Sequence, residues 1–114
     1  MDCMLLIIEP VGQRATRTEA QGHEAYQRML DFGAGLAAQG RLKSAESLAP
    51  LSQAVRVSPA GVFDGPFAEA KEMIGGYFLF SCDSRDQALA IARACPAAEW
   101  ATVELRFLAP CYVS

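Results

Sequence analysis

One histidine, His23, is the residue of this sequence best suited to moving protons near neutral pH. The imidazole is the only side chain whose unperturbed charge changes between about pH 5 and 8. General acid–base catalysis places such a group within hydrogen-bond reach of its proton donor or acceptor. Asp64 is the candidate partner, and we expect His23 and Asp64 to act together as acid and base. The plainer alternative is a surface histidine beside Glu24 and an aspartate that caps its own turn.

Asp64 opens a run, 64–80, that joins a turn to a group of charges and then to an apolar strand. Gly65 tolerates positive φ, and Pro66 fixes its own φ and restricts the residue before it. Charged side chains follow over 69–72. Loops held on a rigid scaffold often carry function. The run therefore indicates either a site or a well-formed turn followed by a solvated loop.

Further charged and aromatic side chains are candidates for holding a substrate. Arg56, Glu104 and Arg106 fall on the polar sides of their predicted strands. If those sides are enclosed, the three groups need partners and suit a small anion or carboxylate. If they lie at an exposed edge, they form ordinary cross-strand ion pairs. The full set of substrate-binding candidates is Arg56, Glu69, Lys71, Tyr77 and Arg106.

Several classes of function are disfavoured by what the sequence lacks. It has no Ser/His/Asp triad, P-loop or dinucleotide fingerprint. The four cysteines form no C-x-x-C pair and there is one histidine, so we expect no metal and no cofactor. The net charge is −3 without a Lys/Arg cluster, which argues against nucleic acid. No apolar run is long enough to cross a membrane and no basic leader precedes one, so we expect a cytoplasmic protein with reduced thiols.

The elements that must position these residues alternate between apolar strands and amphipathic helices. Apolar runs or alternation predict strands, and three- and four-residue apolar spacing predicts helices. Pro59-Ala60-Gly61 suits a hairpin turn, and Ser84 with Gln87 resembles a capping box. Strands are predicted over 4–8, 41–48 (weakly), 54–58, 62–63, 74–82 and 101–108, and helices from 18 or 19 to 39 and from 83 or 84 to 95.

A chain of 114 residues with this order of elements reads as a single domain, 1–114. Two helices on one face of a mainly antiparallel sheet give the α+β class, and the order is that of a ferredoxin-like βαββαβ fold with an extra hairpin. The first strand and the strand 74–82 are apolar on both sides, and two helices cover one sheet face only. A second copy is the simplest cover for the other face, so we expect a two-fold homodimer with stacked sheets.

The sequence resembles the DGPF-domain group of the YCII-related family over nearly its whole length. The matching residues are Met4–Ile7, Glu46–Leu48 with Pro50, Ala54–Val57, the defining run Asp64–Glu69, Lys71–Glu72, Gly75–Leu79, Cys95–Ala98 and Val103–Arg106. Position 70 is Ala where the group usually has Thr or Ser, so a hydroxyl at this position is not essential here.

The resemblance implies a ferredoxin-like subunit in a dimeric α+β barrel. It implies no defined reaction, although the broader family is associated with chemistry through a His–Asp pair. DGPF proteins are often encoded beside extracytoplasmic-function sigma factors, which implies a regulatory setting. Two functions are therefore open: a small enzyme acting on an anionic or carbonyl substrate, and a noncatalytic module that senses a small molecule or contacts a sigma factor.

Overall fold

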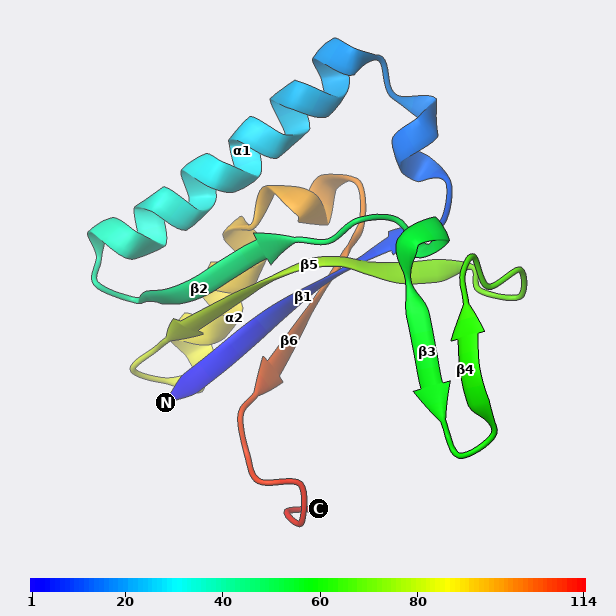
Figure 1. Ribbon diagram of the computed structural model, residues 1–114. Coiled ribbons are helices and arrows are strands. Elements are labelled where there is room, and N and C mark those ends of the chain that lie inside the picture. Colours follow the sequence, from blue (N-terminus) through cyan, green and yellow to red (C-terminus); the bar gives the residue numbers. More distant parts are fainter.

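A four-stranded antiparallel sheet carries both α-helices on one face (Figure 1). The computed structural model describes all of residues 1–114. The order across the sheet is β2-β5-β1-β6. Its strands are β1 (Asp2–Pro10), β2 (Leu42–Ser47), β5 (Glu72–Ser81) and β6 (Thr102–Phe107), and its helices are α1 (Glu19–Ala38) and α2 (Arg85–Ala94). The expected α+β class is confirmed, and none of the helices is long and apolar enough to cross a bilayer.

The core lies between the sheet and the helices because alternate strand residues point to the same face. Along β1, Cys3, Leu5 and Ile7 are buried, and each faces the helices. Phe78 and Phe80 of β5 lie opposite Leu5 and Cys3 in the register. Gly33 of α1 lets the helix approach the ring of Phe78, because a Cβ at this position would lie only 3.3 Å from the ring. The strand expected over 74–82 thus buries Phe78 and Phe80 under the helices, while Tyr77 and Leu79 between them point to the other face.

The N-termini of both helices are set by side-chain caps. Thr18 accepts from the backbone N–H of Gln21, whose side chain accepts in turn from the N–H of Thr18, forming a capping box. Ser84 accepts from the backbone N–H of Gln87, as expected. The Gln87 side chain, however, accepts from Asp83 rather than from Ser84, so the second box is displaced by one residue.

The other face of the sheet, which we call the open face, carries no helix. It presents the half-buried residues Met4, Leu6, Ile8, Tyr77 and Leu79, with Ile74 exposed beside them. Thr102, Glu104 and Arg106 of β6 lie on the same face, opposite Ile8, Leu6 and Met4. The expectation that two helices leave one apolar sheet face uncovered is therefore met.

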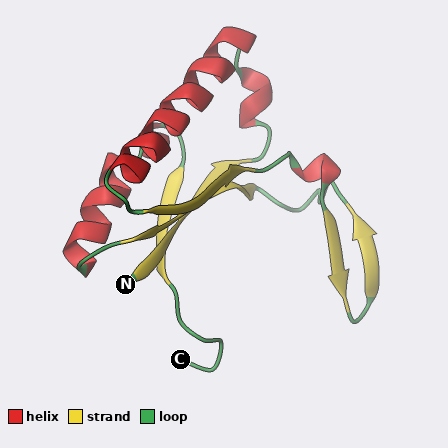
Figure 2. Cartoon of the chain, turned by 60° about the vertical axis from the view of Figure 1, so that its left-hand side comes forward, coloured by secondary structure: helices red, strands yellow, loops and turns green.

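A separate hairpin stands away from this body (Figures 1 and 2). It consists of β3 (Val55–Ser58) and β4 (Gly61–Asp64), which pair only with each other. Val57 and Val62 face one another across the hairpin and are largely exposed, at 77% and 68%. The radius of gyration is 15.5 Å, whereas a compact domain of this length has about 13 Å. The hairpin contributes to this extended shape.

The turn after β4 depends on Gly65, for a reason different from the one that the sequence suggested. Positive φ occurs at Gly12, Gly40 and Gly61, and Gly65 is not among them. The Gly65–Pro66 peptide bond is cis, and the N–H of Gly65 donates to the carbonyl of Ala54 at 2.8 Å. A Cβ on Gly65 would overlap the carbonyl oxygen of Leu51. Close backbone approach, not a left-handed conformation, therefore requires glycine here.

Candidate functional site

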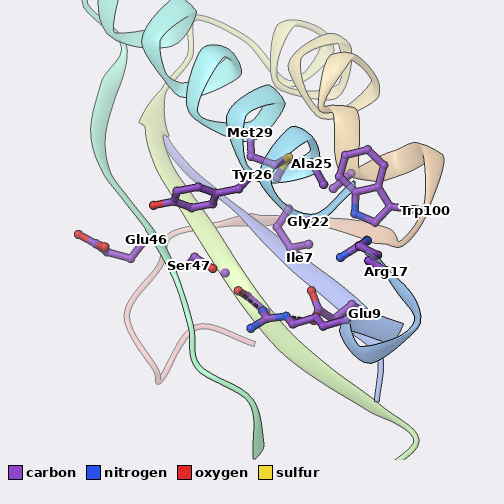
Figure 3. A pocket seen from close by; sticks show the side chains of 14 residues that line it. Ile7, Glu9, Arg17, Gly22, Ala25, Tyr26, Met29, Glu46, Ser47 and Trp100 are labelled. Carbon is purple, nitrogen blue, oxygen red and sulfur yellow. Dashed lines mark hydrogen bonds and ion pairs between the residues drawn. The ribbon is translucent and has the colours of Figure 1, made fainter. Parts of the chain in front are cut away.

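A cavity of about 280 Å³ opens between the first half of α1 and one end of the sheet (Figure 3). The last residues of β1 and the first half of β5 form its floor, and α1 forms its roof. Trp100, which follows the 3-10 helix Pro96–Glu99, stands on one side with Arg17, and Tyr26 stands on the other. It is lined by Ile7, Glu9, Arg14, Arg17, Gly22, Ala25, Tyr26, Met29, Glu46, Ser47, Gly75, Gly76, Ala97 and Trp100.

A buried ion pair lies in the floor of this pocket. Glu9 occupies the last inward position of β1 and is 6% exposed. Arg14, on the short 3-10 helix Gln13–Thr16 that follows β1, donates from Nε to Glu9 Oε1 at 2.6 Å. A buried carboxylate needs such a partner, because the free energy of removing a charged group from water is larger than that of removing a neutral group.

The guanidinium of Arg14 also joins three parts of the chain. Its Nη1 donates to the carbonyl of Leu48 at 2.7 Å, just past β2, and its Nη2 donates to the carbonyl of Gly75 at 3.1 Å. These donors hold the end of β1 against β2 and β5. Arg14 is thus both the counter-ion of Glu9 and a support for the pocket floor.

Two glycines in β5 allow close packing at the pocket floor, Gly75 against the ion pair and Gly76 against the backbone of β2. The register between β1 and β5 shifts between Ile7 and Ile8, where Gly75 lies opposite the irregular step. A Cβ on Gly75 would overlap the carboxylate of Glu9, and a Cβ on Gly76 would lie 2.8 Å from the carbonyl oxygen of Glu46. Only glycine at both positions permits this packing.

The entrance of the pocket is aromatic and cationic. Trp100 is held by Gln13, whose Nε2 donates to the Trp100 carbonyl at 2.7 Å. The guanidinium carbons of Arg17 and Arg28 lie 5.7 Å and 5.4 Å from the centre of the indole ring, within the range of cation–π contacts. Arg28 pairs with Glu99, whereas Arg17 has no carboxylate partner. Arg17 therefore offers a free positive charge at the mouth of the pocket.

The predicted acid–base pair lies outside this pocket. His23 is exposed on α1, and Asp64 is exposed at the end of β4 on the hairpin. Neither lines the cavity, and no hydrogen bond joins them. Their shared catalytic role stays a prediction.

The five predicted substrate-binding residues also lie outside the pocket. Arg56 stacks on the ring of Phe67 at 3.7 Å and pairs with Glu69 at 3.6 Å, tying the hairpin to the turn that follows it. Lys71 is exposed, just before β5. Tyr77 and Arg106 lie on the open face, where Tyr77 shares a hydrogen bond with Ser44 and Arg106 pairs with Glu104.

Glu9, Arg14, Arg17, Tyr26 and Trp100 were not singled out by the sequence. The available signal was Glu9 itself. It follows Ile7 by two positions, so in a strand with alternating faces its carboxylate must point inward as Ile7 does. Gly75-Gly76 was the second signal, since paired glycines in a strand mark a bulge or a close approach. No three His, Cys, Asp or Glu side chains gather closely enough to hold a metal ion.

The fold and pocket are those of a two-layer α+β protein with a ligand-sized cavity between helix and sheet. The YCII-related domain matches residues 4–110, and the chain belongs to this family. An uncharacterized protein of Rhizobium meliloti (strain 1021) is 40% identical over 58 residues, which is 47% of this chain. That match also spans only 47% of the relative's length.

Among the solved structures that match, one covers almost the entire chain. It is 5-chloro-2-hydroxyhydroquinone dehydrochlorinase from Burkholderia phenoliruptrix AC1100, in complex with 2,5-dihydroxybenzoquinone. The TM-score is 0.58 at 12% sequence identity, and the match covers 96% of this chain and 94% of that chain. At this identity the likeness establishes a shared fold.

Proposed function

We propose that this protein is an enzyme that binds a small, acidic, hydroxylated ring compound in the pocket. It would move a proton from one atom of that compound to another. The observation that carries the proposal is the buried Glu9–Arg14 pair in the floor of a cavity with aromatic walls. A cavity of about 280 Å³ is close to the lower end of ligand pockets, which suits one ring rather than a larger molecule. A carboxylate in such a place is a natural general acid or base.

Each wall supplies part of the recognition. The rings of Tyr26 and Trp100 present apolar faces to a planar ligand. Arg17, free of any carboxylate, would pair with an anionic oxygen of that ligand through charge-assisted hydrogen bonds. Glu9 would accept the proton of a ring hydroxyl and return it to a carbon of the same ring, which gives the keto tautomer and restores the carboxylate. Arg14 would keep the carboxylate in place during the transfer. The dihydroxybenzoquinone bound by the structural neighbour is a compound of this chemical class and therefore a suitable probe.

The test is a calorimetric titration with 2,5-dihydroxybenzoquinone and with hydroquinone, followed by chromatographic analysis of the incubated mixture. We expect binding by the wild-type chain and about tenfold weaker binding by Arg17→Ala, since one charged hydrogen bond is removed. Arg93→Ala, on α2 and outside the pocket lining, is the matched control and should bind normally. Turnover should fall by about a hundredfold in Glu9→Gln. Absence of binding at millimolar ligand would contradict the assigned ligand class.

The alternative hypothesis of a His23–Asp64 pair is tested by the same assay. If those residues are the acid and base, His23→Ala should lose at least about a hundredfold in turnover. If Glu9 has this role, His23→Ala should remain fully active while Glu9→Gln does not. The two assignments thus give opposite results with the same substrate.

A noncatalytic binding module is the second candidate. It is favoured by one feature: the charge of Glu9 is already neutralised by Arg14, whose two terminal nitrogens each donate to a backbone carbonyl. Such a pair could serve the structure alone while the pocket senses a ligand. Binding without turnover, unchanged in Glu9→Gln, would support the module. The contact with a sigma factor implied by the family resemblance stays a prediction.

We also propose a homodimer in which the open faces of two copies stack. The apolar and aromatic side chains on this face have no helix above them, and exposed apolar patches of this kind are typical of interfaces. The molecule measures 43 × 40 × 18 Å, a thin two-layer plate that a second copy would complete. Sheet-on-sheet packing is a standard arrangement for such faces.

The finer fold and family assignments rest on the same features. The order β2-β5-β1-β6 with two helices on one face supports the ferredoxin-like fold, and the Asp64–Glu69 run supports membership of the DGPF group. A dimeric α+β barrel would follow from the stacking of the open faces. A cytoplasmic location, expected from the free thiols, stays a prediction.

A further inference from the structure

Two buried thiols meet at the end of the sheet opposite the pocket. Cys3 is the second residue of β1, and Cys82 directly follows β5. Cys3 pairs with Phe80 across the ladder, so Cys82 is its diagonal neighbour on the same inward face. The two Sγ atoms lie 2.7 Å apart, and the residues are 0% and 2% exposed.

This separation is only slightly longer than the bond between two disulfide sulfurs. The sulfurs of a disulfide are about 2.05 Å apart, and disulfides need side chains that point toward each other from neighbouring backbones. Diagonal positions on paired strands meet that need, and a side-chain shift of well under an ångström would bring the atoms together. Cys95, the third buried cysteine, has no such partner.

In the folded protein the thiols of Cys3 and Cys82 are protected from reaction with solutes. Burial, together with the hydrogen bond shared with Cys82 and the charge of its thiolate, raises the pKa of Cys3 to about 12. The thiolate is the reactive form, so attack requires local opening. Such an opening must break three backbone hydrogen bonds beside the two thiols: Met1 N–H to Cys82 O, Cys82 N–H to Met1 O and Leu108 N–H to Asp2 O. Local openings of this kind expose buried groups without unfolding of the whole protein.

We propose that Cys3 and Cys82 form an intrachain disulfide when the protein meets a low-molecular-weight disulfide such as oxidised glutathione. During local opening, one cysteine loses its proton to water. Its thiolate then attacks a sulfur of the oxidant and expels one glutathione thiolate. The second cysteine, also deprotonated, then attacks the mixed disulfide and expels the other glutathione. Two protein thiols are oxidised and one small disulfide is reduced to two thiols, which take up the two protons.

The test uses folded protein carrying Cys111→Ser, because Cys111 is exposed and would react by itself. The protein is incubated with oxidised glutathione, quenched in acid, alkylated, digested and analysed by mass spectrometry. We expect a peptide pair linked through Cys3 and Cys82, lighter by two hydrogens, with Cys95 alkylated. The bond closes a loop across 79 sequence positions. The midpoint of thermal unfolding should therefore rise by about 10 °C and return after reduction under denaturing conditions.

Single substitutions complete the design. Cys82→Ala in the same background should show neither the linked peptide nor the rise in midpoint, whereas Cys95→Ala should show both. The proposal is overturned if the Cys111→Ser protein forms no intrachain bond, keeps glutathione attached to Cys3 or Cys82, or links either residue to Cys95. The mapping in the Cys111→Ser protein decides this even if a core substitution prevents folding.

Discussion

Glu9 stands at a position of β1 where the alternation otherwise places apolar residues. Because the carboxylate is buried, the stability of the fold depends on the positive charge of Arg14 beside it. We expect Arg14→Met to lower the free energy of unfolding by about 2 to 4 kcal/mol, since a buried charge is left unpaired. The double variant Glu9→Leu with Arg14→Met should recover most of this loss, because no buried charge remains. Urea denaturation measures both.

A matched comparison is available at the exposed pair of Lys43 and Asp2, whose charged atoms lie 2.7 Å apart. Lys43→Met should change the free energy of unfolding by less than about 1 kcal/mol, as for other surface ion pairs. An equal loss in Lys43→Met and Arg14→Met would show that burial does not matter at Glu9. At this scale the sequence offered little guidance, because Arg14 reaches Leu48 and Gly75 from far along the chain.

At the scale of elements, the turn between the hairpin and β5 gives a sharp prediction. Gly65→Val should destabilise the protein by a few kcal/mol, on the order of other overpacked sites, because its side chain would collide with the backbone of Leu51. Gly35→Ala is the control: it lies in α1 with nothing near the added Cβ, and it should be neutral or stabilising by up to about 1 kcal/mol. Thermal unfolding compares the two. Equal midpoints would refute the close approach.

The elements themselves could be predicted because each follows from a local pattern. The helix expected from 18 or 19 to 39 is Glu19–Ala38, and the strand expected over 101–108 is Thr102–Phe107. The hairpin around Pro59-Ala60-Gly61 was likewise visible. The pocket was not, since it arises where α1 crosses the ends of strands that are distant in sequence. The hairpin attracted attention through its turn residues, yet Arg56 and Glu69 pair with each other there.

At the scale of the whole molecule, the open face makes the dimer testable. Leu79, half-buried on that face, is the residue to change, because Phe80 lies in the core. We expect light scattering at micromolar concentration to give the mass of a dimer for the wild-type chain. Leu79→Asp should be monomeric or insoluble, since a charge cannot be buried between apolar sheets.

Leu89→Asp is the matched control, because Leu89 is an exposed leucine on α2, on the helix side of the sheet. It should remain dimeric and folded. A stable wild-type monomer, or equal effects of the two substitutions, would show that the open face is not the contact.

The pocket and the open face lie on opposite sides of one sheet, and this separation determines how two sites would behave together. In the proposed dimer the pockets would point outward in opposite directions, each built from residues of one chain, with both sheets between them. Filling one pocket would then leave the other unchanged unless the sheets themselves shifted. Allosteric coupling needs an element that both ligands bias, and a stacked pair of sheets offers none at the contact. Ligand should therefore fill the two subunits independently, along a simple hyperbolic saturation curve.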